Sequence, residues 1–600
     1  MNNVSLKRTF TFLLLLSVIF VASAQAPHAF FKFANKPGYE FAILLFGAEK
    51  GEATLDWGEG STQTITLDPK KGSFIKGKTL SKELTITGNI AAIECSGNEM
   101  TEIVVNTLPE LSAFISRKNF TRKIDFSGNP KLKLLCIENS FLDTLDLSHN
   151  VALDTVLLTS NKLQKLVLPE SVPNLKVLDC SSNFKLNELD LSQCTSLVRL
   201  QLHQTGITKL PLSQHASLQY LSAGLMKPIT QLELPANNII DTLFIPSAGL
   251  KSIDLSGCNR LKVLVVDNNW ALGEINCSNL TELVSLNCIG TSISQLDVSK
   301  CEKLEILNCN NCAIESLDLS KNVKLEVLAC FENALKELDV TNTKLENLDC
   351  SNNVELSRLA LPATLKDLNC SACDLSELSF ITPAIMESLV CSENKISKLD
   401  VSEMSELSAL TCDNNNISSL QTGKLKSLLN LNIASNPIHT LDLSASPRVS
   451  YVKVDGTLLN ACELNTLYES LRAIDQQSQS TGVYFLENNV ENEAATSTTS
   501  IASDKGWTVT IPGDGTGCNQ TGVNNIEMGN KSIDVRYNGS GWTVSGLPSQ
   551  ACVMKLYNLN GALVGRYNCS SSVATIPSSV DCGIYVLIAE GVARTVSLNR

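Results

Sequence analysis

Two pairs of cysteines have the spacing of a redox or metal-binding motif. They are Cys309-Asn-Asn-Cys312 and Cys370-Ser-Ala-Cys373. Two thiols at this spacing can form a catalytic disulfide or supply two ligands to zinc. In each pair, however, the first cysteine belongs to one repeated column and the second lies three residues later in another. We therefore predict that the repeat, and not redox or zinc chemistry, accounts for both motifs.

No other group of residues has the spacing of an active site. The five histidines lack both metal-ligand spacing and a nucleophile partner: His28, His149, His203, His215 and His439. The sequence also lacks HExxH, G-x-S-x-G and a phosphate-binding glycine loop. We expect a protein that is not an enzyme and that binds no cofactor and no metal.

The elements that carry the cysteines repeat with a period of 20 to 22 residues. One column holds an apolar residue or a cysteine at Cys95, Ile115, Cys136, Leu158, Cys180, Leu202, Ala223, Ile245, Val266, Cys288, Cys309, Cys330, Cys350, Cys370, Cys391, Cys412, Ile433 and Val454. Such a period indicates a solenoid of stacked coils that share one core. The alternation L-x-C or L-x-L at the column predicts a short strand with its apolar side chains pointing inward.

Each unit reads L-x-x-L-x-C/L-x-x-N-x-I/L and continues with x-x-L-D-L/V-S. This pattern resembles the leucine-rich repeat, in the short form common in exported bacterial proteins. The resemblance and the period together predict a mainly β leucine-rich-repeat solenoid of about 18 coils of 20–22 residues. The L-D-L-S segment is expected to form a second short strand on the opposite side.

A polar column follows three residues after the first. It holds Asn98, Asn139, Asn161, Asn183, Asn269, Asn333, Asn353, Asn394, Asn415 and Asn436, with Thr205, Thr291, Thr457, Cys312 and Cys373 as variants. An inward asparagine can hydrogen-bond the backbone groups that a strand leaves open where it turns. We expect these side chains to be buried at the turns.

A row of aspartates recurs in the L-D-L/V-S segment, at Asp125, Asp146, Asp190, Asp254, Asp297, Asp318, Asp339, Asp400 and Asp442. Side chains at one position of adjacent coils lie about 5 Å apart, so the row could hold calcium. An aspartate here more often accepts a hydrogen bond from its own following turn. We favour that interpretation.

The charge of the chain limits the classes of partner that it is expected to bind. The chain carries 48 basic and 61 acidic residues, a net charge of −13, and no basic block. This argues against nucleic acid or an anionic membrane as a partner.

Ten of the 21 cysteines lie in the apolar column. We expect mostly buried thiols, because in-register side chains of stacked coils point alongside rather than at one another.

The first residues have the pattern of a secretory signal peptide. Lys7 and Arg8 precede an apolar run over residues 10–21, and a small-x-small cleavage signal ends at Ala24. The run is too short to span a bilayer, and no later stretch is apolar enough for a transmembrane helix. We predict a signal peptide over residues 1–24, cleaved between Ala24 and Gln25. The mature protein is then secreted, extracellular or attached to the outer-membrane surface.

Both ends of the solenoid, predicted over residues 86–460, need covers, since an open end would expose the core. We predict a β cap over residues 25–85, whose turn at Asp56 and Glu59 is either structural, which we favour, or a calcium or glycan site. The phrase ATLDWGEG in that turn resembles β-sandwich modules of exported Bacteroidetes proteins.

Residues 461–515 are predicted to form an α+β cap, with helical spacing from Leu464 to Ile474. Pairing of Cys462 with Cys518 stays open. Within the solenoid, prolines interrupt the repeat and predict a bend or bulge: Pro228, Pro235 and Pro246.

Residues 516–600 form a separate β unit of alternating strands and turns. The segments Val553–Gly561, Gly583–Leu587 and Val592–Arg600 resemble the C-terminal sorting domain of the type IX secretion system. Arg594 stands where that family usually has lysine. The resemblance implies engagement of the secretion machinery, passage across the outer membrane and possible removal of the domain, with the rest lipid-anchored. An ordinary β-sandwich is the alternative.

The residue before the apolar column is expected to point outward on the strand face, where repeat proteins usually bind. Phe114, Leu135 and Leu157 hold this position on three consecutive coils, and Ile137 flanks them. Such an outward apolar cluster indicates a partner site, unless the N-terminal cap folds over it. We therefore predict an adhesion or host-interaction protein that binds a protein or glycan through this face. An envelope scaffold is the alternative, and a surface hydrolase is a weaker one.

Overall fold

The computed structural model describes a defined part of the chain, and every structural statement below concerns that part. The described residues are 27–34, 37–58, 60–225, 228–423, 425–474, 485–487, 492–518, 534–537, 541–545, 552–557, 563–569, 573–577, 580, 583–589 and 592–598. The predicted signal peptide, with its cleavage site at Ala24 and Gln25, lies outside them, and so does Glu59.

The N-terminal strands form a cap of two antiparallel sheets. They are β1 (His28–Phe33), β2 (Glu40–Gly47), β3 (Gly51–Asp56), β4 (Thr62–Leu67), β5 (Ser73–Lys78), β6 (Glu83–Thr87), β7 (Ile90–Glu94) and β8 (Met100–Val104). One sheet has the order β4-β3-β6-β1-β8, while β2 pairs with both β5 and β7. The rings of Phe41 and Trp57 meet edge to face at 5.2 Å. The backbone N–H of Gly58 donates to Asp56 at 2.8 Å, which closes the turn at that aspartate.

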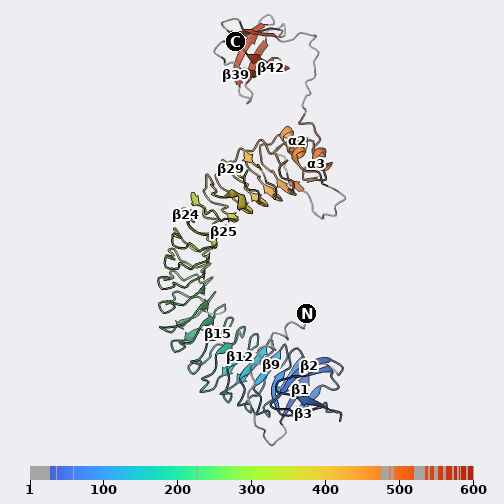
Figure 1. Ribbon diagram of the computed structural model, residues 1–600, viewed down its shortest axis with the longest axis vertical. Coiled ribbons are helices and arrows are strands. Elements are labelled where there is room, and N and C mark those ends of the chain that lie inside the picture. The colour runs from blue at the N-terminus through green and yellow to red at the C-terminus, as the bar shows by residue number, and fades with distance from the viewer. Residues whose placement is uncertain are drawn as a thin grey trace. The chain divides into compact units, whose positions relative to one another are not determined.

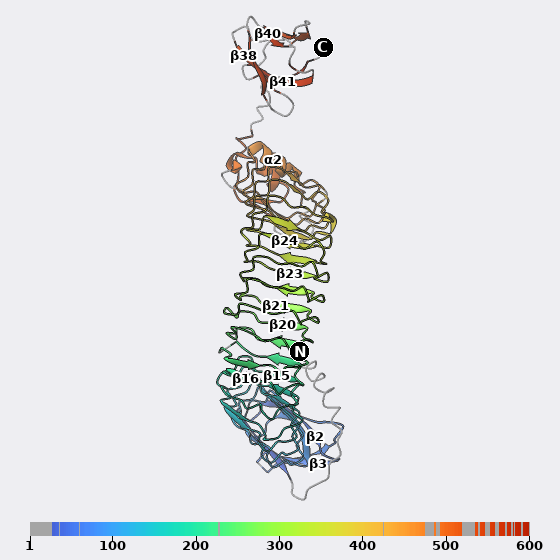
Figure 2. The ribbon, with the colours of Figure 1, turned by 90° about the vertical axis from the view of Figure 1, so that its left-hand side faces the viewer.

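From β7 onward, one strand of each coil joins a long parallel sheet, here called the inner sheet. Its strands are β7, β9 (Ala113–Arg117), β10 (Leu134–Glu138), β12 (Thr155–Leu157), β14 (Val177–Asp179), β15 (Arg199–Gln201), β17 (Tyr220–Ser222), β19 (Thr242–Phe244), β20 (Val263–Val265), β21 (Ser285–Asn287), β22 (Ile306–Asn308), β23 (Val327–Ala329), β25 (Asn347–Asp349), β27 (Asp367–Asn369), β28 (Ser388–Val390), β30 (Ala409–Thr411), β32 (Asn430–Asn432), β33 (Tyr451–Lys453), β34 (Phe485–Glu487) and β35 (Thr508–Val509). They pair in register, as Leu178 of β14 does with Leu200 of β15. Figure 1 shows these strands along the inner side of an arc, and Figure 2 shows them stacked.

The opposite side of the solenoid carries only short strand pairs. They are β11 (Thr144–Asp146) with β13 (Lys165–Val167), β16 (Lys209–Pro211) with β18 (Gln231–Glu233), β24 (Glu337–Asp339) with β26 (Arg358–Ala360), and β29 (Leu399–Asp400) with β31 (Leu420–Gln421). A single turn of 3-10 helix, η1 (Pro383–Ile385), interrupts the later coils. The chain is therefore a mainly β solenoid, as the repeat predicted.

Each coil leaves the inner sheet through a residue with positive φ, two positions after the inward column. These residues are Gly97, Lys118, Asn139, Ser160, Ser182, Gln204, Leu225, Ser247, Asn268, Gly290, Asn311, Glu332, Asn352, Ala372, Glu393, Asn414, Ser435 and Gly456. A left-handed residue reverses the chain sharply and exposes backbone groups at the turn. In most of the described coils, the polar side chain of the next residue satisfies those groups.

Asn183 shows how the polar column works. Its Nδ2 donates to the carbonyl oxygens of Cys180, 2.8 Å away, and of Leu158 in the preceding coil, 3.0 Å away. Its Oδ1 accepts from the N–H of Leu163 at 3.1 Å. One buried amide thus joins its own turn to the coil before it. Asn161, Asn353, Asn394, Asn415 and Asn436 repeat the arrangement and are also buried.

The predicted register is wrong in two early coils. Leu135 pairs with Phe114 on one side and with Val156 on the other, so Ile137, and not Cys136, aligns with Leu158. The inward column therefore begins Cys95, Ser116, Ile137 and Leu158. The polar column accordingly runs through Asn119 and Ser140, while Asn139 supplies the left-handed turn with φ 51°.

A second row of buried polar residues, which the sequence analysis missed, lies on the opposite side. Asn150 Nδ2 donates to the carbonyl oxygens of Phe126 and Asn129, both at 2.9 Å. Asn129 and Asn322 make the corresponding bonds in their own coils. The signal was present, because these asparagines follow the L-D-L/V-S segment at a fixed spacing.

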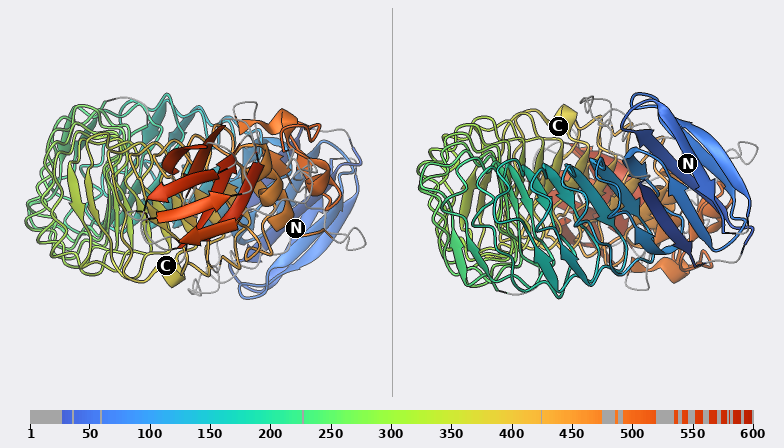
Figure 3. Two further views of the ribbon diagram at one scale, coloured as in Figure 1. Left: turned by 90° about the horizontal axis from the view of Figure 1, so that it is seen from above. Right: turned by 90° about the horizontal axis from the view of Figure 1, so that it is seen from below.

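Cap residues complete this bonding at both ends of the repeat. At the first coil, Asn98 exchanges bonds with the backbone of Ala42 in β2, through Nδ2 at 2.8 Å and Oδ1 at 2.9 Å. Strand β2 thus replaces the missing preceding coil, and Figure 3 shows the N-terminal strands as a broad sheet. At the last coil, Asn492 Nδ2 donates to the carbonyl oxygen of Val454 at 2.9 Å.

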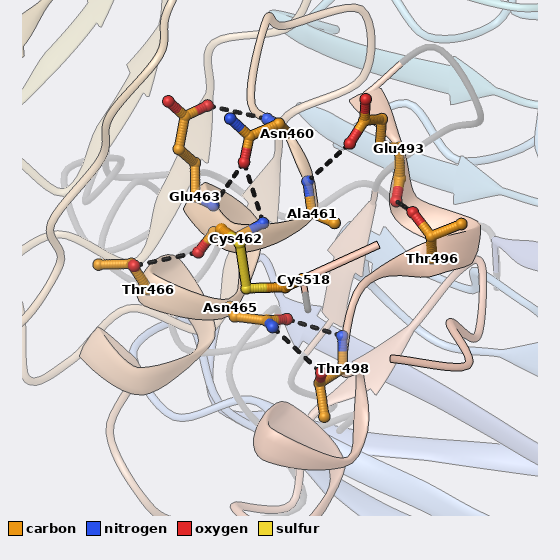
Figure 4. Close-up of a disulfide and its surroundings, with 10 residues drawn as sticks. All are labelled: Asn460, Ala461, Cys462, Glu463, Asn465, Thr466, Glu493, Thr496, Thr498 and Cys518. Atoms are coloured by element: carbon orange, nitrogen blue, oxygen red, sulfur yellow. Dashed lines mark hydrogen bonds between the residues drawn. A yellow bond between two sulfur atoms is a disulfide. The ribbon is translucent and has the colours of Figure 1, made fainter. Parts of the chain in front are cut away.

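Helix α2 (Ala461–Ser470) begins earlier than the apolar spacing predicted, because Asn460 caps it. Asn460 Oδ1 accepts from the N–H groups of Cys462 and Glu463, and the Glu463 carboxylate accepts from the N–H of Asn460 at 2.8 Å. Cys462 and Cys518 form a disulfide beside this cap (Figure 4). The pairing that the sequence left open is therefore present.

The remaining elements are short helices and a C-terminal β unit. The helices are η3 (Ala494–Thr496) and α3 (Ser500–Ser503). The strands are β36 (Asp534–Tyr537), β37 (Gly541–Ser545), β38 (Cys552–Tyr557), β39 (Leu563–Cys569), β40 (Val573–Pro577), β41 (Gly583–Ala589) and β42 (Val592–Leu598). They form two antiparallel sheets, β36-β37-β40 and β39-β38-β41-β42. Alternate residues of β37 and β40 are buried, including Trp542 and Ile576.

Candidate binding face

The inner sheet presents three outward positions per coil. In β12 and the residues that follow it, these are Thr155, Leu157 and Thr159, while Val156 and Leu158 between them are fully buried. The same alternation continues through the inner sheet because its strands pair in register. These outward positions form a continuous surface, which we call the inner face.

Three of the four predicted partner-binding residues are not on this face. Phe114, Leu135 and Ile137 are each 0% exposed, and the Phe114 ring packs against Phe126 at 5.3 Å. The prediction is wrong because the register of these coils is shifted by one residue, which exchanges the inward and outward sides of a strand. Only Leu157 lies at an outward position and is half-buried.

The outward positions that replace them in these two coils are also covered. Ile115 is 2% exposed and Cys136 is 1% exposed. Cys136 Sγ lies 3.5 Å from the carboxylate of Glu138, which pairs with the Arg117 guanidinium at 2.5 Å. This end of the inner face therefore presents an ion pair and no apolar cluster.

Apolar side chains gather instead near the middle of the inner face. Outward positions there hold the partly exposed Tyr220, Phe244, Val263, Ile306, Val327 and Phe331, and also Val265, which is only 7% exposed. The guanidinium of Arg199 stacks on the Tyr220 ring at 3.8 Å and marks the edge of this group. Ile306 remains 37% exposed. The middle of the face thus offers apolar surface that a partner can bury.

The same coils and those that follow also present amides and carboxylates held by neighbouring coils. Asn308 Nδ2 donates to Asn287 Oδ1 at 2.8 Å. Asp413 Oδ1 accepts from Ser392 Oγ at 2.6 Å and from Asn432 Nδ2 at 2.9 Å. These bonds run from coil to coil and fix the side chains in place, which lowers the entropy that a partner must remove on binding.

The charge of the inner face has one sign over most of its length. From Tyr220 to Ala434, the outward positions contain four aspartates, Asp267, Asp349, Asp367 and Asp413, and no lysine, arginine or histidine. Arg199 and His203 precede this stretch at outward positions, and Lys453 follows it. Burial raises the pKa of Asp267 and is opposed by the N–H of Ile289. The long middle of the face is therefore acidic and apolar.

The aspartate row lies outside this face and closes turns. Asp297 Oδ1 accepts from the N–H of Ser299 at 2.9 Å, and the same bond recurs at Asp125, Asp146, Asp190, Asp254, Asp318, Asp339, Asp400 and Asp442. These backbone bonds lower the pKa of Asp297 and Asp318. The turn interpretation is confirmed. Among the described residues, no three histidine, cysteine, aspartate or glutamate side chains are grouped as ligands for a metal ion.

The cysteines behave largely as the repeat predicted. Of the sixteen free cysteines whose side chains the structure describes, all but Cys312 are buried. Cys309 and Cys370 lie in the inward column, and Cys312 and Cys373 lie in the polar column. Each polar-column thiol points at the carbonyl oxygen of a cysteine in the preceding coil, Cys312 at 3.2 Å and Cys373 at 3.5 Å.

The repeat period, the parallel inner sheet and the buried turn asparagines define a leucine-rich-repeat solenoid. No protein-family model and no curated protein matches the chain. Within the described residues, no helix is both long enough and apolar enough to cross a membrane.

Solved structures that align with the chain include leucine-rich-repeat proteins. The functional domain of InlJ from Listeria monocytogenes, which includes a cysteine ladder, is 19% identical to this chain. The alignment covers 86% of this chain and 93% of the InlJ chain, with a TM-score of 0.39. YopM from Yersinia enterocolitica is 23% identical, and its alignment covers 62% of this chain and 83% of the YopM chain, with a TM-score of 0.47. A leucine-rich-repeat protein from Leptospira interrogans is 15% identical, and its alignment covers 68% of this chain and 91% of the Leptospira chain, with a TM-score of 0.31.

Proposed function

We propose that this protein is an exported, cell-surface binding protein whose inner face engages a protein partner. The observation that carries the proposal is the inner face itself. It combines a group of apolar side chains with hydrogen-bonded amides and carboxylates on one continuous sheet. Apolar surface supplies binding energy, and fixed polar groups around it supply specificity.

The charge of the face narrows the chemistry of the partner. Four aspartates and no lysine or arginine occupy the outward positions between Arg199 and Lys453. A partner with exposed lysine or arginine beside apolar groups complements such a face, whereas an acidic partner is repelled. This favours a protein over a neutral glycan.

Charge reversal on the face tests the proposal. Asp367 is half-buried at an outward position of β27, and Asp367→Lys should weaken binding at least tenfold and make it less sensitive to salt. Glu302, which is exposed and lies outside the inner sheet, provides the matched control Glu302→Lys. Equal effects of the two substitutions on binding of a partner recovered from host or neighbouring cells would contradict the assignment to the inner face.

Export is supported by the two sequence patterns at the ends of the chain. The leader over residues 1–24 predicts secretion, and residues 516–600 resemble a type IX sorting domain. We expect the native protein to lack both segments and to be accessible to protease on intact cells. A full-length protein in the periplasm would overturn the sorting proposal and favour the envelope-scaffold alternative. Turnover of a glycan or peptide substrate would instead favour a surface hydrolase.

A further inference from the structure

A hollow of about 860 Å³ lies beside the first coils of the solenoid, away from the inner sheet. Residues of strands β8 and β11 line it together with residues of the coil between them, and the ring of Phe120 forms part of its wall. Its volume falls within the range of about 300 to 1,000 Å³ that is typical of small-molecule sites. The hollow shares no outward position with the inner face.

Phe120 presents an aromatic ring to this hollow. The residue follows the turn residue Asn119, and its N–H donates to the carbonyl oxygen of Met100 at 2.8 Å, which fixes its backbone. The ring of Phe141, at the same position of the next coil, lies 5.8 Å from the Phe120 ring between centroids, and Lys162 Nζ lies 4.5 Å from the Phe141 centroid. Phe120 itself is 40% exposed. The packing therefore holds a flat aromatic ring where a ligand can reach it.

Charged side chains of both signs share the hollow with this ring. The carboxylates are Glu102, Asp125, Asp143 and Asp146, and the cations are Arg122 and Lys123. Asp143 pairs with Arg122 at 3.7 Å, and the Arg122 side chain stays 69% exposed. Asp125 accepts from Asn106 Nδ2 at 2.7 Å through one oxygen and from the N–H of Ser127 at 2.8 Å through the other. Hydrogen-bond acceptors and donors thus lie side by side, and neighbouring groups hold several of them in place.

We propose that this hollow binds a neutral glycan, with one sugar ring against Phe120. The C–H face of a pyranose ring is apolar and slightly positive, which suits the negative face of an aromatic ring. Each sugar hydroxyl is both a donor and an acceptor, so one sugar can bond to the carboxylates and to the Arg122 guanidinium at the same time.

The mixed charge of the hollow argues against the other classes of small ligand. Four carboxylates repel an anion, such as an acidic sugar, while Arg122 and Lys123 beside them disfavour a cation. An apolar ligand would remove water from these groups without replacing its hydrogen bonds. A neutral molecule that is rich in hydroxyl groups and has one apolar side avoids all three penalties.

The test uses the full native chain and an array of neutral oligosaccharides of glucose, galactose, mannose and N-acetylglucosamine, with acidic oligosaccharides for comparison. We expect binding to at least one neutral oligosaccharide, and the tightest of these is then titrated by calorimetry. Phe120→Ala should weaken this binding about tenfold, whereas Phe120→Trp, which keeps an aromatic face, should retain it. A hexalysine peptide, added as a competitor, should not displace the oligosaccharide.

Phe184 provides the matched control. It holds the same position as Phe120 three coils later and is 52% exposed, but it lies outside the hollow. Phe184→Ala should change the affinity by less than about twofold. Asp367→Lys should also leave it unchanged, which tests this site separately from the inner face.

Three outcomes would overturn the proposal. They are no binding to any neutral oligosaccharide on the array, displacement of the bound oligosaccharide by hexalysine, and equal losses of affinity in Phe120→Ala and Phe184→Ala. The second outcome would instead identify a site for basic peptides.

Discussion

Two stretches of the solenoid share a backbone but satisfy their turns in different ways. In residues 391–436, each turn has its own asparagine, as Asn394 and Asn415 show. In residues 223–270, the polar column holds Ala248, which has no polar side chain. Asn269 of the next coil compensates, because its Oδ1 accepts from the N–H groups of both Ala248 and Leu250 at 3.0 Å.

The difference shows which column the fold depends on. The apolar column tolerates cysteine, leucine, alanine and isoleucine with no change of path, since neighbouring coils share the space. The turn carbonyls and amides have no such freedom, because each buried backbone group needs a partner. Where one asparagine is missing, the asparagine of the next coil accepts one additional backbone N–H. A cavity of about 660 Å³ lined by Pro228, Ile229, Gly249 and Leu250 opens in the same stretch.

Removing the shared amide should have the largest effect. Asn269 also donates to the carbonyl oxygens of Ile245 at 2.9 Å and Val266 at 2.7 Å. Asn269→Ala leaves four buried backbone groups unpaired, and we expect a loss of about 4 kcal/mol in the free energy of unfolding. Urea denaturation measures it. A loss below about 1 kcal/mol would show that the turns do not depend on this amide.

Removing an amide that accepts only one N–H group from the preceding coil should cost less. Asn394 donates to the carbonyl oxygens of Cys370 and Cys391 and accepts from the N–H of Leu375 at 3.0 Å. For Asn394→Ala we expect a loss of about 3 kcal/mol in the same assay. The exposed Asn416 provides the control, and Asn416→Ala should change the free energy by less than about 0.5 kcal/mol. Equal costs at Asn269 and Asn394 would remove the contrast between the two stretches.

A polar substitution in the apolar column should cost less again. Cys370 is fully buried, and Cys370→Ser places a hydroxyl there at a cost of about 2 kcal/mol. Ser116 occupies the same column naturally, but its Oγ accepts from Asn119 Nδ2 at 2.8 Å. Cys370→Ala, which adds no polar group, provides the comparison. A serine variant as stable as the alanine variant would show that the column is hydrated.

Hydrogen exchange compares the two stretches without mutation. The backbone amides of residues 243–250 should exchange about tenfold faster than those of residues 389–396. The turn at Ala248 depends on the side chain of Asn269 in the next coil, and we expect such a turn to open more easily. Mass spectrometry of overlapping peptides measures this ratio. Faster exchange in residues 389–396 would reverse the assignment of the weaker stretch.

Acid should produce the smallest effect, through the aspartates of the outer turns. The N–H of Ser148 lowers the pKa of Asp146 below its ordinary value of 3.8. A lowered folded pKa means that the stability is present above the unfolded value and is lost as pH falls through the folded one. The urea midpoint should therefore fall below pH 4, and Asp146→Asn should reduce that fall slightly. A midpoint insensitive to acid would contradict this account of the turns.

The sequence predicted the solenoid because its period is repeated many times, and it predicted the buried asparagines from their spacing. It did not fix the register at Leu134, Leu135, Cys136 and Ile137, where four apolar residues in a row hide the alternation. The left-handed residue at Asn139 decides that register. Many residue types hold the equivalent left-handed position in other coils, so the sequence alone does not identify it. The predicted site at Phe114, Leu135 and Ile137 failed for the same reason. The acidic middle of the inner face was missed because its four aspartates lie in three different outward columns.

The most direct test of partner binding through the inner face uses two valines of one coil. Val327 lies at an outward position of β23, and Val323, which is 48% exposed, lies in the preceding turn outside the inner sheet. Each is replaced in turn by a photo-crosslinking phenylalanine, and the two variants are irradiated with a recovered partner. We predict a crosslink from position 327 that is lost with Asp367→Lys, and none from position 323. Crosslinking from position 323 alone would contradict binding through the inner face.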